Sequence, residues 1–338
     1  MNFMLRKITS FVLRCRLEDV MAVVFSATLL LFFLTTRLFR SFQLQGHDII
    51  FILLPVGILG VKCLLEMLAA SESQPGENLN TGKFLVSFFK PLAKIVRDWF
   101  PFLLLSACYY ALYTNLMLRV NPHLADALLS RIDAMLLGGH QASLLLEPWI
   151  HPLTTDFLSL IYFSYVFTLP GVALYFYLKK EKAIFRRVMM GYLTLMLMGI
   201  VSYLLVPANG PEVFFADQYS RELNGHGIIR GVDYIMRVGR VSYDCFPSLH
   251  VGIPLLLSLY LRDYRRGLFL PALVYVVLMC GATIYLRYHY VVDVMVSFLY
   301  APAAYWLNDF LLSHWPGERI IAVATAATTN PNSNTSGC

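Results

Sequence analysis

Long apolar runs dominate this sequence and limit what the chain can fold into. A helix needs about 20 residues to cross about 30 Å of hydrocarbon, and eight apolar runs of roughly that length occur. Only 14% of the residues are charged, whereas about a quarter are charged in soluble domains. The chain is therefore predicted to be an all-α polytopic membrane bundle of about eight transmembrane helices, near residues 18–37, 48–70, 98–118, 153–178, 187–206, 247–261, 267–286 and 290–311.

A polar segment divides the predicted bundle. Residues 71–84 contain Pro, Gly, Ser and Asn in a pattern typical of a loop. We therefore expect an N-terminal two-span segment with its loop at 1–84 and a six-helix core at 85–313. Residues 314–338 end in a stretch rich in Ala, Thr, Asn and Ser, which indicates a flexible tail. Between the third and fourth runs, residues 119–152 predict one or two short helices on the membrane surface.

The basic residues predict the orientation of the chain. They are concentrated before the first run and after the second, fourth and sixth runs, and cytoplasmic loops carry such an excess. Both termini are then expected in the cytoplasm, and residues 207–246 and 287–289 on the opposite side. The net charge of +6 is spread over short loops, which argues against nucleic acid and leaves membrane lipids as the expected partners. The sequence does not indicate an oligomeric state.

The cysteines do not predict a disulfide framework. Of the six, three lie in apolar runs, two fall on the predicted cytoplasmic side, and only Cys245 is expected outside. CxxC and HExxH signatures do not occur, so neither a cofactor nor a bound metal is expected. A metal site formed by His250, His289 and Asp293 is conceivable, but it lacks a clear further ligand.

The stretch from Cys245 to Asp293 contains the strongest candidates for catalysis. It opens with Cys-Phe-Pro-Ser-Leu-His250 and closes with Arg287-Tyr-His289-Tyr-Val-Val-Asp293. Two membrane crossings joined by the basic loop at 262–266 lie between them, so both histidines are expected on one side of the membrane. In addition, the sixth run is short, which predicts that His250 lies below the membrane surface.

These residue types fit phosphoryl transfer through a covalent intermediate. Asp293 follows His289 by four residues, one helical turn, and can hold one ring nitrogen protonated while the other attacks phosphorus. His250 is the expected acid and base for the leaving and accepting oxygens. Arg287 would balance charge on the phosphoryl oxygens. Ser248, at a helix N-terminus, would add hydrogen-bond donors for phosphate.

The preceding loop offers further phosphate ligands. Arginine forks match phosphate oxygens, and an external loop with several arginines runs against the usual charge bias. Asn209 and Arg240 are the candidates chosen from this loop. An equally strong alternative is that the loop arginines pair with lipid headgroups, or with acidic neighbours in the same loop, namely Glu212, Asp217, Glu222 and Asp233.

At these residues the chain resembles the type 2 phosphatidic acid phosphatase superfamily. Pro247-Ser-Leu-His250 matches its second motif and His289-x-x-x-Asp293 the end of its third. The resemblance covers about residues 98–311, a six-helix core, and is closest to the branch with fungal inositol phosphorylceramide synthase. The first motif, Lys-x6-Arg-Pro, is not found, and Ala282-Thr283 replaces the usual Ser-Arg. Arg287 is our candidate for the missing arginine.

The resemblance implies a membrane phosphotransferase or phosphatase that acts on a lipid phosphate or phosphodiester through a phosphohistidine. The branch favours transfer of inositol phosphate or a similar headgroup to a lipid. One alternative is hydrolysis of a lipid phosphate or polyprenyl diphosphate. A second, of a different class, is a transporter or flippase that uses the same residues as a proton relay, although no internal repeat of the kind common in transporters is found.

Overall fold

The structure, a computed structural model, describes residues 16–36, 92–106, 109, 120–226 and 243–315. The described part is mostly helical and contains no strand. One helix covers residues 92–106. The other long helices lie close to the predicted apolar runs: α2 (Leu17–Thr36), α7 (Pro152–Leu178), α8 (Lys182–Leu205), α11 (Leu249–Tyr264), α12 (Phe269–Tyr285) and α13 (Val291–His314).

Four helices in the described part are long and apolar enough to cross a membrane, which fits an integral membrane protein. They are α7, α8, α13 and the continuous segment Arg266–Tyr285 that contains α12. The predicted count of eight is not confirmed, because the run at 48–70 lies outside the described residues and the run at 98–118 is described mainly up to residue 106. As predicted, α11 is short: its 16 residues span about 24 Å at about 1.5 Å per residue.

Helix α11 is the centre of the bundle. It packs against α7, α8, α12 and α13, and most of its side chains are buried. Its first turn lies very close to α8. A Cβ atom added at Gly199 of α8 would be only 2.7 Å from Leu249 Cδ1. The start of α11, which carries His250, is therefore held between other helices instead of facing lipid.

One end of the bundle carries a network of ion pairs. Arg187 at the start of α8 contacts Asp263 near the end of α11 at 3.0 Å and Asp309 near the end of α13 at 2.7 Å. Nearby on α8, Arg186 donates two hydrogen bonds to the buried Glu18 of α2. The basic loops before α8 and after α11 therefore lie at the same end of the bundle.

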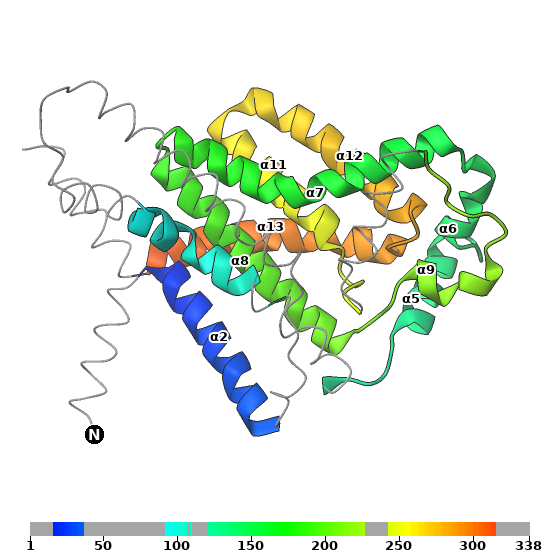
Figure 1. The fold of residues 1–338 in the computed structure, drawn as a ribbon, viewed down its shortest axis with the longest axis horizontal. Coiled ribbons are helices and arrows are strands. Elements are labelled where there is room, and N and C mark those ends of the chain that lie inside the picture. The colour runs from blue at the N-terminus through cyan, green and yellow to red at the C-terminus, as the bar shows by residue number, and fades with distance from the viewer. Residues whose placement is uncertain (1–15, 37–91, 107–108, 110–119, 227–242, 316–338) are drawn as a thin grey trace, which may run out of the picture.

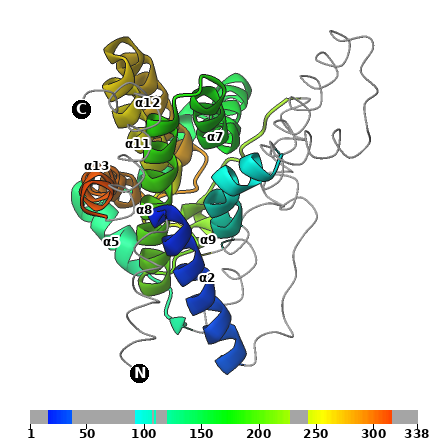
Figure 2. The same ribbon diagram turned by 90° about the vertical axis from the view of Figure 1, so that its left-hand side faces the viewer.

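Short helices lie at the other end, to the right in Figure 1. We call them the cover: α5 (Asp126–Leu136), α6 (Ala142–Leu145), η2 (Glu147–Trp149), α9 (Pro211–Phe214) and η3 (Ala216–Gln218). Helix α5 packs against α13 and α9, and α6 packs against α12. Figure 2 shows the long helices and α2 from a second direction. The short helices predicted between the third and fourth runs are present as α5, α6 and η2.

Candidate active site

Two histidines from separate segments meet at the end of the bundle that carries the cover. Ser248 is the N-cap of α11, which places His250 in the first turn of that helix. His289 lies in the connection between α12 and α13. The Nδ1 atom of His250 is 3.2 Å from the Nε2 atom of His289, across 39 residues of sequence. The two imidazoles that the sequence singled out are therefore in hydrogen-bonding contact.

The other nitrogen of His289 identifies its tautomer. Its Nδ1 atom is 2.9 Å from the backbone carbonyl oxygen of Cys245, and because a carbonyl can only accept, Nδ1 carries the proton. In the neutral ring, Nε2 then has a free lone pair, and His250 is the donor in the contact between the two rings. Asp293, expected to orient this ring, lies farther away, with Oδ2 at 3.5 Å from Nδ1.

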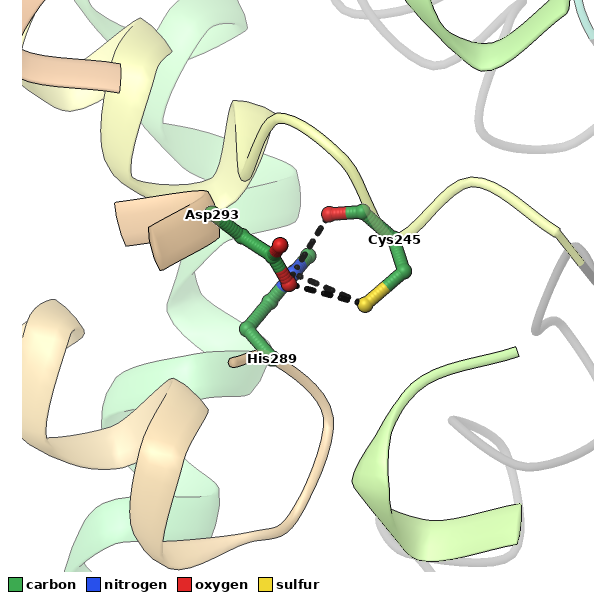
Figure 3. Close-up of side chains that lie close together, drawn as sticks. All are labelled: Cys245, His289 and Asp293. Atoms are coloured by element: carbon green, nitrogen blue, oxygen red, sulfur yellow. Dashed lines mark hydrogen bonds and ion pairs between the residues drawn. The ribbon is translucent and has the colours of Figure 1, made fainter. Parts of the chain in front are cut away.

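Asp293 and the Cys245 side chain complete a small buried cluster (Figure 3). The Cys245 thiol donates to Asp293 Oδ2 at 2.9 Å, and the Tyr290 backbone N–H donates to the same oxygen at 2.8 Å. Burial, together with the charge of Asp293, raises the pKa of the Cys245 thiol well above its usual value. The thiol therefore stays protonated and donates its hydrogen to the carboxylate.

Ser248 presents polar groups beside the histidines. Its side chain is fully buried, and its Oγ atom has no hydrogen-bond partner among the described residues. Its backbone is fixed on both sides, since its N–H donates to the carbonyl oxygen of Asp293 and its own carbonyl accepts from Ser297 Oγ. A helix N-terminus with a free hydroxyl is suited to bind an anion such as phosphate.

Aromatic rings hold His250 from the side of α7. The Tyr162 ring stacks on the His250 ring with centroids 4.6 Å apart and an interplanar angle of 26°. Tyr165, one turn along α7, lies 4.4 Å from His250 in a tilted arrangement. Tyr162 also stacks on Tyr288, immediately before His289. The tyrosines limit the rotation of His250 and link its position to the segment that carries His289.

Arg287 lies next to the site but is tied to the cover. Its side chain is only 6% exposed, and Nη2 donates to Glu147 Oε1 at 3.1 Å and to the carbonyl oxygen of Arg221 at 2.7 Å. Its guanidinium carbon lies 3.6 Å from the centre of the Tyr219 ring, a cation–π contact. Burial lowers the pKa of Arg287. The Nε atom has no partner among the described residues.

Of the other two phosphate-binding candidates, Asn209 and Arg240, only Asn209 lies among the described residues. The backbone N–H groups of Asn209 and Gly210 donate to the two carboxylate oxygens of Asp126 at 3.0 and 2.9 Å. Gly210 has a φ of 90°, and a Cβ atom there would lie 2.5 Å from the Tyr288 carbonyl oxygen. Glycine is therefore required where this loop approaches the segment before His289. Arg240 lies outside the described residues.

The comparison with protein families identifies the family of the chain. A family model described as the PAP2 superfamily matches residues 127–307, more than half of the chain. The chain belongs to the PAP2 superfamily. Proteins of this superfamily are generally phosphatases or phosphotransferases that act on phosphate-containing substrates. The match contains both histidines and Asp293, and it lies within the range of the predicted resemblance. Searches of curated proteins and of solved structures found no match to this chain.

The cover contributes two carboxylates that the sequence analysis did not select for this PAP2 site. Asp133 of α5 accepts hydrogen bonds from the backbone N–H groups of Val291 and Val292 at 2.7 and 2.9 Å. Asp126 also accepts from the Tyr290 hydroxyl at 3.0 Å. The two aspartates are seven residues apart on one helix, a spacing of two turns that places both on the same face. Helix α5 therefore holds the segment 290–292 between His289 and Asp293.

The cover also contributes a third carboxylate, Glu147. Besides Arg287, it accepts hydrogen bonds from the Ser220 N–H and hydroxyl and from the Arg221 N–H, at 2.9 to 3.1 Å. Burial raises the pKa of Glu147, but the hydrogen bonds from Ser220 and Arg221 and the charge of Arg287 lower it by more, so its pKa lies below the usual value. Glu147 thus stays charged and joins η2, the segment after η3 and the turn before His289.

Proposed function

We propose that this PAP2 protein transfers a phosphate-containing group of a membrane lipid through a covalent phosphohistidine at His289. The observation that supports this most strongly is the 3.2 Å contact between His250 Nδ1 and His289 Nε2. It pairs a lone pair able to attack phosphorus with a proton able to reach the leaving oxygen. Neither histidine alone would support more than a structural role.

The reaction proceeds in two displacements. In the first, the lone pair of His289 Nε2 forms a bond to phosphorus while the bond from phosphorus to the leaving oxygen breaks. His250 gives its Nδ1 proton to that oxygen. In the second, His250 removes a proton from the acceptor hydroxyl, whose oxygen bonds to phosphorus as the nitrogen–phosphorus bond breaks. Nδ1 of His289 keeps its hydrogen bond to Cys245 throughout, and Asp293 stabilises the positive charge that the ring acquires.

The phosphoryl oxygens bind at the start of α11. The buried Ser248 hydroxyl has no partner among the described residues, and the first backbone N–H groups of the helix add partial positive charge. Arg287 contributes its buried charge and its Nε atom, which has no partner among the described residues. Asn209, in the loop beside Asp126, and Arg240 remain sequence-based candidates for further contacts. In this proposal Arg287 takes the place of the third-motif arginine that the chain lacks, and the loop that contains Asn209 stands near the place of the absent first motif.

The substrate class follows from the surroundings of the site. Four apolar helices fit an integral membrane protein, and the short α11 is consistent with a site below the membrane surface, where a lipid headgroup can reach the histidines. We propose transfer of inositol phosphate or a similar headgroup to a lipid hydroxyl. If water takes the place of the hydroxyl, the same chemistry hydrolyses a lipid phosphate or a polyprenyl diphosphate.

The site is proposed to face the non-cytoplasmic side, with both termini in the cytoplasm. The basic loops before α8 and after α11 lie at one end of the bundle, where Arg187 and Asp263 form an ion pair. The positive-inside rule makes that end cytoplasmic. The histidines lie at the other end of α11.

The test is to incubate purified protein with headgroup-labelled phospholipids, with and without inositol or lipid hydroxyl acceptors. A new labelled phosphodiester lipid supports transfer, whereas labelled phosphate without such a product supports hydrolysis. His289→Ala must remove both products. His314→Ala is the matched control, because His314 is an exposed histidine at the far end of α13. Full activity in His289→Ala would reject the mechanism, and a protein that moves lipids without chemistry would support the transporter alternative.

A further inference from the structure

The buried cluster beside the histidine pair has the composition of a metal site. Cys245 Sγ, His289 Nδ1 and Asp293 Oδ2 lie within 4.8 Å of one another, and their side chains are drawn in Figure 3. The residues are 3%, 4% and 0% exposed, respectively. We propose that these three residues bind a thiophilic divalent cation, with Zn²⁺ the best fit, and that the bound ion inhibits the enzyme.

The distances between the ligand atoms are close to those of a tetrahedral zinc site. Bond lengths of about 2.3 Å to sulfur and about 2.0 to 2.2 Å to nitrogen and oxygen place tetrahedral ligand atoms about 3.3 to 3.6 Å apart. The structure has 3.7 Å between Sγ and Nδ1 and 3.5 Å between Nδ1 and Oδ2. The hydrogen-bonded pair Sγ and Oδ2, at 2.9 Å, must separate when the thiol proton leaves. The Cys245 carbonyl oxygen, 2.9 Å from Nδ1, must also move aside so that the ion can reach that nitrogen.

The present contacts of the three groups are those that an ion would replace. The thiol hydrogen points to Asp293, and the Nδ1 hydrogen of His289 points to the Cys245 carbonyl. Binding releases the thiol proton, while the ring proton of His289 moves from Nδ1 to Nε2 and the imidazole stays neutral. The thiolate and carboxylate then balance the two positive charges of the ion. In addition, Asp293 Oδ1 is buried and has no hydrogen-bond partner among the described residues. An ion beside the carboxylate gives this oxygen a favourable neighbour.

The donor set selects the kind of ion. Ca²⁺ requires six to eight oxygen ligands and Mg²⁺ prefers oxygen and water, whereas sulfur and imidazole ligands suit Zn²⁺ and chemically similar ions. His250 is not a ligand in this geometry, because it contacts Nε2, on the opposite edge of the His289 ring. The sequence predicts no bound metal, and the conceivable set of His250, His289 and Asp293 lacks a clear further ligand. The structure instead brings the Cys245 sulfur to the Nδ1 edge of His289.

Inhibition follows because the ion uses the catalytic groups. When Nδ1 coordinates the ion, the ring proton of His289 lies on Nε2, so Nε2 has no lone pair left to attack phosphorus. The ion also occupies the Asp293 oxygen that would stabilise the phosphorylated ring. Binding of the ion does not depend on the reaction, so the metal site and the proposed function can fail separately.

Co²⁺ tests the site directly, because thiolate coordination gives a charge-transfer band in the near ultraviolet that needs no activity. Purified full-length protein is treated with a chelator, freed of it and titrated with CoCl₂. We expect the band to saturate at one Co²⁺ per chain and to be displaced by ZnCl₂. Cys245→Ser should lose the band, whereas the matched variant Cys280→Ser, at a half-buried cysteine of α12, should keep it.

If Cys245→Ser does not fold, a second variant tests the site. Asp293→Asn keeps the thiol but removes a charged ligand, so its affinity for Co²⁺ should fall by about tenfold or more. A band absent from wild-type protein, a band unchanged in folded Cys245→Ser, or an unchanged Co²⁺ affinity in Asp293→Asn would overturn the inference. If the band appears and no phosphoryl chemistry is found, the metal site stands and the proposed function fails.

Discussion

His250 donates its Nδ1 hydrogen to His289 Nε2, so the proposed acid and the proposed nucleophile are hydrogen-bonded to each other. A phosphoryl group has to enter between the two rings and break this contact. Tyr162, which stacks on His250, and Tyr165, which contacts it in a tilted arrangement, limit how far that ring can move. Substrate binding therefore requires a small, directed separation of the two imidazoles.

The separate roles of the two histidines can be distinguished by the leaving group. With a lipid substrate, whose alkoxide needs protonation, His250→Ala should lower kcat by about 10²- to 10⁴-fold, the usual contribution of an acid–base group. With p-nitrophenyl phosphate, whose leaving group needs no proton, the loss in the rate of the first displacement, measured as a burst of p-nitrophenol, should be much smaller. His289→Ala should abolish turnover of both substrates. Equal losses for both substrates in His250→Ala would remove its role as the acid.

Asp133 is expected to position the segment between His289 and Asp293. Its two oxygens accept from the first two N–H groups of α13, and an asparagine can replace only one of these acceptors. Asp133→Asn should lower the free energy of unfolding by about 0.5 to 2 kcal/mol, the usual cost of losing a helix cap. It should also lower kcat, with a smaller change in KM. Thermal unfolding and initial rates measure the two effects. Asp217→Asn, an exposed acid of the cover, is the control and should change neither.

The Glu147 contacts should make the stability of the cover depend on pH. Because the pKa of Glu147 is lower in the folded protein, Glu147 stabilises the folded state fully above the usual glutamate pKa of about 4.3. This stabilisation is lost as the pH falls through the pKa of Glu147 in the folded protein. Glu147→Gln should lower the unfolding temperature by a few degrees at pH 6 to 8. The difference from wild type should shrink below about pH 4. A difference that stays constant to low pH would contradict this assignment.

The proposed orientation can be checked with cysteines introduced at exposed positions. Leu128 of α5 and Arg265 after α11 are both exposed and belong to opposite ends of the bundle. A membrane-impermeant maleimide should label Leu128→Cys in intact cells and Arg265→Cys only after permeabilisation, above the background of the wild-type cysteines. The reverse pattern would place the site in the cytoplasm. Cys245 is unsuitable as a probe because it is buried.

The sequence predicted the long helices well, since apolar runs and their polar ends define them locally. It also predicted the histidine pair, because both motifs and the hairpin between them lie in one continuous stretch. It did not predict that the Cys245 carbonyl, rather than Asp293, makes the shorter bond to His289. Every residue has a backbone carbonyl, so the sequence does not indicate which one accepts a hydrogen bond. The position of the Cys245 carbonyl depends on how the loop before α11 packs.

The roles of α5 and Glu147 were not predicted for a different reason. Asp126 and Asp133 are 164 and 158 residues from the groups they bind near α13, and no pattern within α5 identifies such distant partners. The seven-residue spacing of the two aspartates shows only that they share a face. Similarly, the sequence suggests Arg287 as a phosphate ligand but does not reveal its contacts with Glu147 and Tyr219.

The central claim is that His289 becomes phosphorylated during turnover. The direct measurement is to mix the purified enzyme with a lipid that carries radioactive phosphorus, quench in alkali within the first turnover, and map the label by mass spectrometry. We predict an acid-labile, alkali-stable phosphohistidine at His289 in wild type and in His314→Ala, and none in His289→Ala. Turnover that continues in His289→Ala, or that proceeds in wild type without any label on this residue, would contradict the account.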